Sequence, residues 1–373
     1  MKRVLISILA RVKGNVNANG TVAALTEIKK FFTTDGETRV FVSGRCVKYC
    51  IKQRLSEKGF ELSPLERPRR VVISKGNPVL YIDDDLFGFM MAEVPGEAAR
   101  RRFAPIKTDG IVALKHCEIT RDFGGRFDPT EKEMPSPFEV EVADFIGQNN
   151  WILTENIGKF ENKEITDEII QSSPVELEEK EENGKKYYCL PAEPSDTSKL
   201  VYGRKNRLEA FLEVLLKERY TFPRSATGLH QPHYYYAVIL PTERLLPLFA
   251  HIDYEIKNGK VVLNLDKIED LGSLLMDGEK ITIIDFEHAL DEEIKLRIEN
   301  YKRKIKEIED KIKSAGDEKQ KKEMEEKKEE SEKRIEALKS IEIVNPYKIE
   351  SVIDDNNKNI KLIDEITKYL VGA

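Results

Sequence analysis

Residues 13–20 read Lys-Gly-Asn-Val-Asn-Ala-Asn-Gly, and residues 43–55 read Ser-Gly-Arg-Cys-Val-Lys-Tyr-Cys-Ile-Lys-Gln-Arg-Leu. The first stretch is too rich in Asn and Gly for a protein core, whereas the second has the apolar spacing of an amphipathic helix. We interpret the pair as a grip on a nucleic-acid backbone. The alternative is a solvated turn beside an ordinary surface helix.

The predicted helix has two distinct faces. Its apolar stripe consists of Cys46, Val47, Cys50, Ile51 and Leu55. Ser43 is a suitable N-cap and Gly59 a suitable C-terminal stop, so the helix should run for about four turns. The second face carries three cations and an aromatic ring at helical spacing, and this pattern is typical of a surface that contacts phosphates. Its members are Arg45, Lys48, Tyr49 and Lys52.

The segment before the helix offers uncharged donors. Asn15, Asn17 and Asn19 alternate with other residues, and Gly and Asn tolerate the positive φ angles that anion-binding turns need. We therefore expect these amides, together with the ammonium group of Lys13, to lie along phosphate or ribose oxygens. A loop of amide donors beside a cationic helix suits RNA.

The composition indicates a globular protein of two or three domains. The chain has 373 residues, 40% of them hydrophobic, and no run of 18 apolar residues. We expect no membrane span, and no signal peptide because Arg11 and Lys13 interrupt the first apolar run. Four cysteines in so long a chain favour a reducing cytoplasm over a disulfide framework. Cys46 and Cys50 lack the second ligand pair of a zinc site, and we expect no metal or cofactor.

Charge is distributed unevenly along the chain. Residues 1–126 contain 23 basic and 14 acidic side chains, a net charge of +9, whereas the remainder carries −15. A basic N-terminal third on an acidic whole indicates one surface for a polyanion rather than a uniformly basic coat.

The N-terminal third has the pattern of an RRM-like or ferredoxin-like unit. Residues 3–12 and 39–42 are predicted strands, and residues 34–37 are a turn between predicted elements. Residues 21–32 are predicted to form a short helix or an irregular arm. A strand, a long loop and a helix that packs behind a sheet are typical of these folds.

The region 67–126 is irregular in pattern. Its basic clusters, residues 67–70 and 100–102, are interpreted as solvated surface. The acidic triplet 83–85 begins a predicted small packed helix rather than a metal site, because consecutive carboxylates rarely converge on one ion. A strand is predicted over 111–119. Residues 121–127 form a predicted loop, in which Arg121 and Arg126 suit phosphate contact; a hairpin turn with a hydrophobic anchor is an equal alternative.

The middle of the chain is acidic, and the run 176–182 is a predicted exposed loop. Helical spacing predicts a helix over 206–220. The following loop, 222–233, contains Arg224 and His230, which we expect to contact RNA. A Tyr-rich strand over 234–240, a helix over 242–249 and a hairpin at Asn258-Gly259 should complete the sheet begun at the N-terminus.

The region 290–338 has a different pattern. Seven apolar residues from Leu290 to Ile312 recur at steps of three and four, which is the seam of a coiled coil. A break at 314–317 precedes a second, highly charged helix. The pattern predicts an antiparallel helical hairpin about 35 Å long at 1.5 Å per residue.

Catalysis has little support in the sequence. There is no nucleophile elbow, phosphate-binding loop, dinucleotide fingerprint or His-Glu-x-x-His motif. His230 and His233 could act as general base and acid in a metal-independent endoribonuclease. We favour contact with RNA for these histidines and no enzymatic activity.

The sequence also resembles a known family, the DevR-type CRISPR-associated autoregulators. The resemblance spans roughly residues 2–286. It is carried by residues 4–11 leading into 15–19, Ser43-Gly44-Arg45 at the start of the first helix, Asp85-Leu86-Phe87-Gly88, and 222–227 before the Tyr-rich strand.

This resemblance implies an α+β fold, a modified RRM palm with large finger and thumb insertions, and no catalysis. The palm would comprise residues 1–60 and 234–287, the insertions 61–233, the hairpin 288–340, and a C-terminal segment 341–373. Members provide the backbone subunit of type I-B Cascade. The implied partners are CRISPR RNA, copies of the same chain along that RNA, other Cascade subunits, and the target DNA strand through the guide. Arg45, Lys48 and Lys52 would hold RNA phosphates, and Asn15, Asn17 and Asn19 would follow the backbone.

Overall fold

The computed structural model describes residues 1–65, 74–91, 99–125, 137–224, 228–314, 318–344 and 352–372. The chain forms two compact units. Unit 1 comprises residues 1–4, 10–233 and 360–373, and unit 2 comprises residues 5–9 and 234–359. Each unit combines a sheet with helices, so the predicted α+β class is confirmed.

The main sheet of unit 1 is ordered β1–β10–β8–β5–β4. Strand β1 contributes residues to both units and is buried along most of its length, because it is almost continuously apolar. Neighbours from β10 to β4 pair antiparallel. The strands are β1 (Arg3–Gly14), β10 (Phe138–Thr154), β8 (Ile106–Ala113), β5 (Thr38–Ser43) and β4 (Lys30–Phe32).

The first half of β10 belongs to a second set of strands. It pairs parallel with β3 (Leu25–Ile28) and antiparallel with β9 (Thr120–Gly124), and β3 pairs with β2 (Ala18–Val22). The predicted helix or arm over 21–32 is therefore wrong. The buried Glu141 carboxylate on β10 accepts hydrogen bonds from the Ile28 backbone and from Lys30, and these bonds fix the segment beside β10. Most of the described part of the predicted loop 121–127 is strand β9.

Helix α1 (Gly44–Glu57) forms where the sequence predicts it. The Ser43 hydroxyl caps it by accepting from the Cys46 backbone N–H, and Gly59 follows its end with a φ of 88°. The predicted apolar stripe is buried, and α1 packs against β5 and β8. The predicted strands 3–12 and 39–42 and the predicted helix are thus present as β1, β5 and α1, whereas the predicted long loop contains β2, β3 and β4.

Unit 1 contains further short elements that the sequence predicts less well. The predicted helix 206–220 is present as α4 and a π-helical turn, η2. The predicted loop 176–182 is wrong in part, since β12 pairs with β13 in a three-stranded sheet with β11. Bounds are α2 (Ile82–Phe87), β6 (Phe89–Met91), β7 (Arg100–Arg102), β11 (Lys159–Glu161), α3 (Asp167–Gln171), β12 (Glu178–Glu182), β13 (Lys185–Cys189), η1 (Thr197–Tyr202), α4 (Arg204–Leu212) and η2 (Glu213–Glu218).

Unit 2 is built around the strand order β1–β14–β17–β18. The Tyr-rich strand and the hairpin at Asn258-Gly259 are confirmed, and both turn residues have positive φ. The predicted helix 242–249 is wrong, because only the short η3 forms there. Bounds are β14 (His233–Thr242), η3 (Leu248–His251), β15 (Tyr254–Lys257), β16 (Lys260–Leu263), α5 (Leu265–Gly272), β17 (Ile281–Asp285), β18 (Ile341–Val344) and α8 (Val352–Val371).

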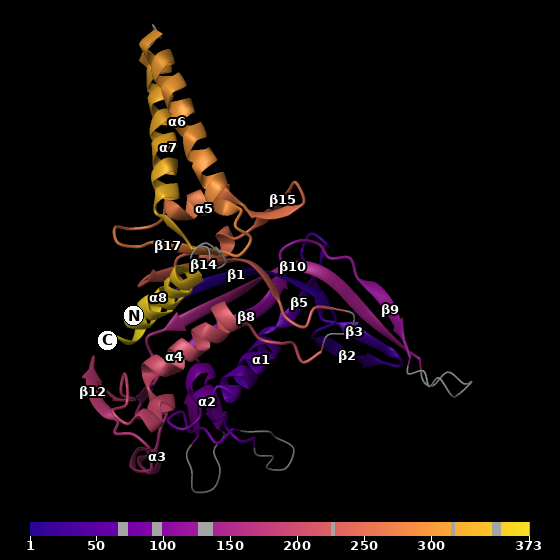
Figure 1. Ribbon diagram of the computed structural model, residues 1–373, viewed down its shortest axis with the longest axis vertical. Coiled ribbons are helices and arrows are strands. Elements are labelled where there is room, and N and C mark those ends of the chain that lie inside the picture. The colour runs from indigo at the N-terminus through magenta and orange to yellow at the C-terminus, as the bar shows by residue number, and fades with distance from the viewer. Residues whose placement is uncertain are drawn as a thin grey trace. The chain divides into compact units, whose positions relative to one another are not determined.

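The predicted helical hairpin is confirmed as α6 (Leu290–Ser314) and α7 (Glu318–Lys339), which lie side by side with α5 at their base (Figure 1). Leu290 and Ile294 are buried, whereas the later seam residues are half-buried. At the base the buried Glu269 carboxylate of α5 pairs with Arg297 and Arg334 and accepts from the Tyr301 hydroxyl at 2.8 Å. Charged groups therefore fix α5 to both helices.

Candidate nucleic-acid interface

The Asn-rich segment is bound to the start of α1. The Asn17 side-chain oxygen accepts a hydrogen bond from the Ser43 backbone N–H at 2.9 Å. This contact joins the two stretches that the sequence pairs as one grip. Residues 13 and 17 are at most about 14 Å apart, at no more than 3.6 Å per residue. Lys13 thus lies four residues before the contact with the helix N-terminus.

The three Asn side chains do not form one row of surface donors. Asn15 is 1% exposed, and its amide donates to the Glu141 backbone carbonyl at 3.0 Å. The interpretation of Asn15 as a surface donor is therefore wrong, because a buried amide needs an internal partner. Asn19 is exposed and lies 3.5 Å from Glu27, so it and the ammonium group of Lys13 remain at the surface.

The cationic face of α1 is present but not uniform. Arg45 and Tyr49 are exposed, and Lys48 is half-buried with its ammonium 5.6 Å from the Phe87 ring centroid. The Lys52 ammonium differs, because it lies 2.8 Å from the buried Asp83 carboxylate. Lys52 thus already has a carboxylate partner, which a phosphate would have to replace.

A further cation joins this face from the sheet. Burial lowers the pKa of the Lys48 ammonium, and the charges of Lys52, Arg45 and Lys107 on β8 lower it further. Their mutual repulsion means that the face gains electrostatic stability when a polyanion binds. The sequence analysis missed Lys107, which has no signal except its place on a strand beside the helix.

The acidic triplet 83–85 on α2 contacts this face, because Asp83 pairs with Lys52. The Asp85 carboxylate pairs with the buried Arg102 and Arg207 guanidinium groups at 2.7 and 2.8 Å, and accepts from the Gly158 backbone. The predicted packed helix over the triplet is confirmed. The interpretation of residues 100–102 as solvated surface is wrong for Arg102, which is 5% exposed because it is the partner of Asp85.

Residues 228 and 229 of the predicted loop 222–233 lie against the end of β1. The Leu229 backbone donates to the Lys13 carbonyl at 3.1 Å, and the Phe222 backbone donates to the His230 carbonyl at 2.8 Å. A Cβ atom at Gly228 would lie 1.9 Å from the Lys13 carbonyl oxygen, so only glycine fits there. Arg224 and His230 are exposed on this loop. Gly228 and Leu229 therefore lie beside Lys13.

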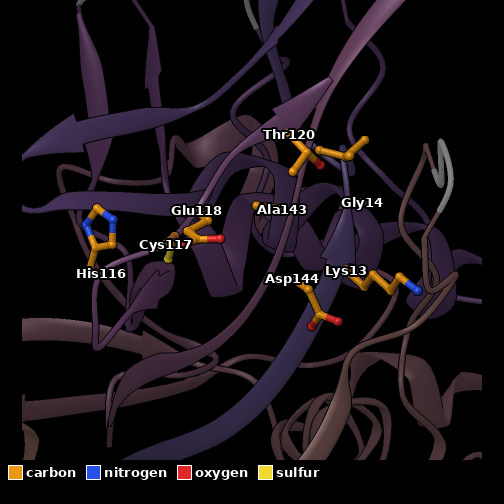
Figure 2. Close-up of a pocket in the computed structure, with 9 residues that line it drawn as sticks. Lys13, Gly14, His116, Cys117, Glu118, Thr120, Ala143 and Asp144 are labelled. Carbon is orange, nitrogen blue, oxygen red and sulfur yellow. The ribbon is translucent and has the colours of Figure 1, made fainter. Parts of the chain in front are cut away.

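A cavity of about 440 Å³ opens beside Lys13. Figure 2 shows Lys13 and His116 on opposite sides of it, with Glu118 between them. Asp144 also lines the cavity, and its hydrogen bond with Arg11 lowers the pKa of its carboxyl below the ordinary value. Because two carboxylates face the same space, a polyanion gains less from this cavity than from α1.

Arg121 and Arg126 are the remaining predicted contacts. Arg121 is exposed on β9, 3.4 Å from Glu139. Arg126 lies outside the described residues. The described residues hold no group of three His, Cys, Asp or Glu side chains that could bind a metal. Within this same part of the chain, no helix is long and apolar enough to cross a membrane.

No family model matches the sequence, and no curated protein matches it. Two solved structures resemble the fold at 12% sequence identity, and both alignments cover 77% of this chain. One is titled "CRISPR RNA-guided surveillance complex", with a TM-score of 0.46 over 90% of that chain. The other is titled "CRISPR RNA-guided surveillance complex, pre-nicking", with a TM-score of 0.45 over 92% of that chain.

The structure gathers some of the predicted contacts into one main surface and one accessory site, and these do not include Asn15, Arg121 or Arg126. The main surface is the α1 face, and the accessory site is the end of β1 with the loop 222–233. Asn17 connects them through its bond to the start of α1.

Proposed function

We propose that this chain is a non-enzymatic CRISPR RNA-binding subunit that polymerises along the guide RNA. It forms the backbone of a type I-B Cascade complex, in which the guide recognises target DNA. The observation that carries the proposal is the cationic face of α1, on which Arg45, the half-buried Lys48 and the exposed Tyr49 lie at neighbouring helical positions. The resemblance of the sequence to the DevR-type family supports CRISPR RNA as the ligand.

The physical basis of binding is neutralisation of phosphates. Lys48 loses solvation by its burial and is repelled by its neighbours, so a phosphate beside it relieves both costs. Phosphate contacts release counterions and carry no base identity. A face of this kind holds any guide sequence, as a backbone subunit must. Lys52 contributes less, because Asp83 already compensates its charge.

The test is the salt dependence of binding to single-stranded RNA. Arg45→Ala with Lys48→Ala should weaken binding to all sequences about equally. The slope of log K against log salt should become flatter by about 1.4, at roughly 0.7 per phosphate contact in single strands. The matched control is Lys295→Ala with Lys333→Ala on the hairpin, which removes the same charge from exposed positions.

An unchanged slope in the Arg45 and Lys48 variant would contradict the proposal. Equal effects of the two double variants would also contradict it, since total charge alone would then explain binding. The RNA should be recovered intact. Cleavage of repeat RNA that disappears in His230→Ala or His233→Ala would establish the endoribonuclease alternative instead.

A further inference from the structure

Strands β6 and β7 form a two-stranded hairpin with one outward-facing apolar and cationic surface. Met90 is 77% exposed and lies opposite Arg101 in the antiparallel pair. Phe103 follows β7 and is 66% exposed, with the Arg101 guanidinium 5.0 Å from its ring centroid. Large exposed apolar side chains that gather in one place indicate a contact site.

Alternation along β7 explains why this surface points outward. Arg102 lies between Arg101 and Phe103 and faces inward, where Asp85 and Glu164 hold its guanidinium at 2.7 and 2.8 Å. Successive side chains of a strand point to opposite faces, so the inward anchor directs Arg101 away from the core. The Arg102 anchor therefore fixes the outward orientation.

A short segment of chain links this surface to the cationic face of α1. The ring of Phe87 lies 5.6 and 5.9 Å from the ammonium groups of Lys48 and Lys52. Gly88 then turns the chain directly into β6 with a φ of 73°. A Cβ atom at Gly88 would lie 2.4 Å from the Arg102 carbonyl oxygen, so β6 and β7 approach closely at this turn. Only two residues, Gly88 and Phe89, separate Phe87 from Met90.

We infer that Phe103 and Arg101 form a stacking platform for the bases of single-stranded RNA whose phosphates lie on α1. This inference rests on the proposed function. An aromatic ring with an adjacent guanidinium offers flat and cationic contacts to any base, because every base has a π-face. Met90 extends the same surface with a polarizable apolar side chain. The platform adds affinity without reading sequence.

The test measures the loss of RNA affinity in one variant and the fluorescence of an introduced tryptophan in another. Phe103→Ala should weaken binding to an oligouridine by roughly tenfold, the order expected for one stacked base, and leave the salt slope unchanged. Phe103→Trp should retain binding, and its exposed indole should be quenched when the oligonucleotide binds. The natural Trp151 is fully buried and serves as the internal reference. The matched control is Phe32→Ala, since Phe32 is 71% exposed on β4.

The inference fails if Phe103→Ala binds as wild type while the Arg45 and Lys48 variant still flattens the slope. It also fails if the indole at position 103 is not quenched, or if Phe32→Ala weakens binding equally. A changed oligomeric state of Phe103→Ala without RNA, at unaltered RNA affinity, would assign the surface to a protein contact instead. Absence of RNA binding by the wild type would refute the proposed function itself.

Discussion

At the scale of single residues, buried charge determines where the cationic face lies. Asp85 is fully buried and pairs with two buried guanidinium groups that come from β7 and α4. Helix α2, strand β7 and helix α4 are therefore joined by one buried cluster of charged side chains. The Lys52–Asp83 pair then fixes α1 to the same triplet.

Removing the Asp85 carboxylate should therefore be costly. Asp85→Ala leaves Arg102 and Arg207 buried without their carboxylate, and breaking buried pairs in this way typically costs about 3 to 5 kcal/mol. Urea unfolding would measure the loss. Asp83→Ala is the control within the triplet, because its partner Lys52 is about one-third exposed and can be solvated. An equal loss in both variants would contradict the central role of Asp85.

The neighbouring Asp84 should make stability depend on pH. Burial and the adjacent Asp83 raise the pKa of its carboxyl to about 6. An acid whose folded pKa exceeds its unfolded value binds protons on folding, so its stabilising contribution is complete near pH 4 and is lost as pH rises through 6.

Asp84→Asn removes the free-energy cost of ionising this buried carboxyl at high pH. The variant should be more stable than wild type by about 2 to 3 kcal/mol at pH 8, at 1.36 kcal/mol per pKa unit, and the difference should vanish towards pH 4. Urea unfolding at both pH values measures it. The exposed Glu176→Gln variant is the control for the loss of one negative charge. A constant Asp84→Asn difference would contradict the assignment.

At the scale of elements, local patterns predict helices better than strand partners. Helix α1 is predicted with its cap and stripe because both depend on spacings within one turn. Strand β10 is not predicted, although it has 17 residues and pairs with β8, β9 and β3. Its polar residues Gln148 and Asn149 look unlike core, yet both are buried, and Asn149 donates to the Gly110 carbonyl at 2.6 Å.

The candidate site shows the same division. The α1 face follows from the sequence because its members share a helix. Lys107 and the β6–β7 surface come from elements distant in sequence, so their approach depends on tertiary contacts that spacing does not encode. Asn15 shows the opposite error. Its turn-like surroundings predict a surface donor, but its amide is buried and donates to the Glu141 backbone carbonyl. The burial of Arg102 within an Arg triplet depends on its ion pair with Asp85, so the local sequence alone does not predict it.

At the scale of the whole molecule, charge is divided along the chain between a basic N-terminal third and an acidic remainder that contains the helical hairpin. The first 126 residues carry +9, whereas the rest carries −15. Within the hairpin, ion pairs of both signs cover the surface, such as Lys328 with Glu309 at 2.7 Å. A surface balanced in this way offers little attraction to phosphates.

The hairpin should therefore be removable without loss of RNA affinity. Replacing residues 302–332 with a short Gly-Ser turn keeps Tyr301 and Arg334, which bind Glu269 at the base. Affinity of the isolated chain should stay within about 1 kcal/mol of wild type, because the replaced segment is distant in sequence from the α1 face and is balanced in charge. A second deletion that also removes Tyr301 and Arg334 tests whether base contacts are needed for folding. A tenfold loss of affinity in the folded first variant would place the hairpin in the RNA-binding surface.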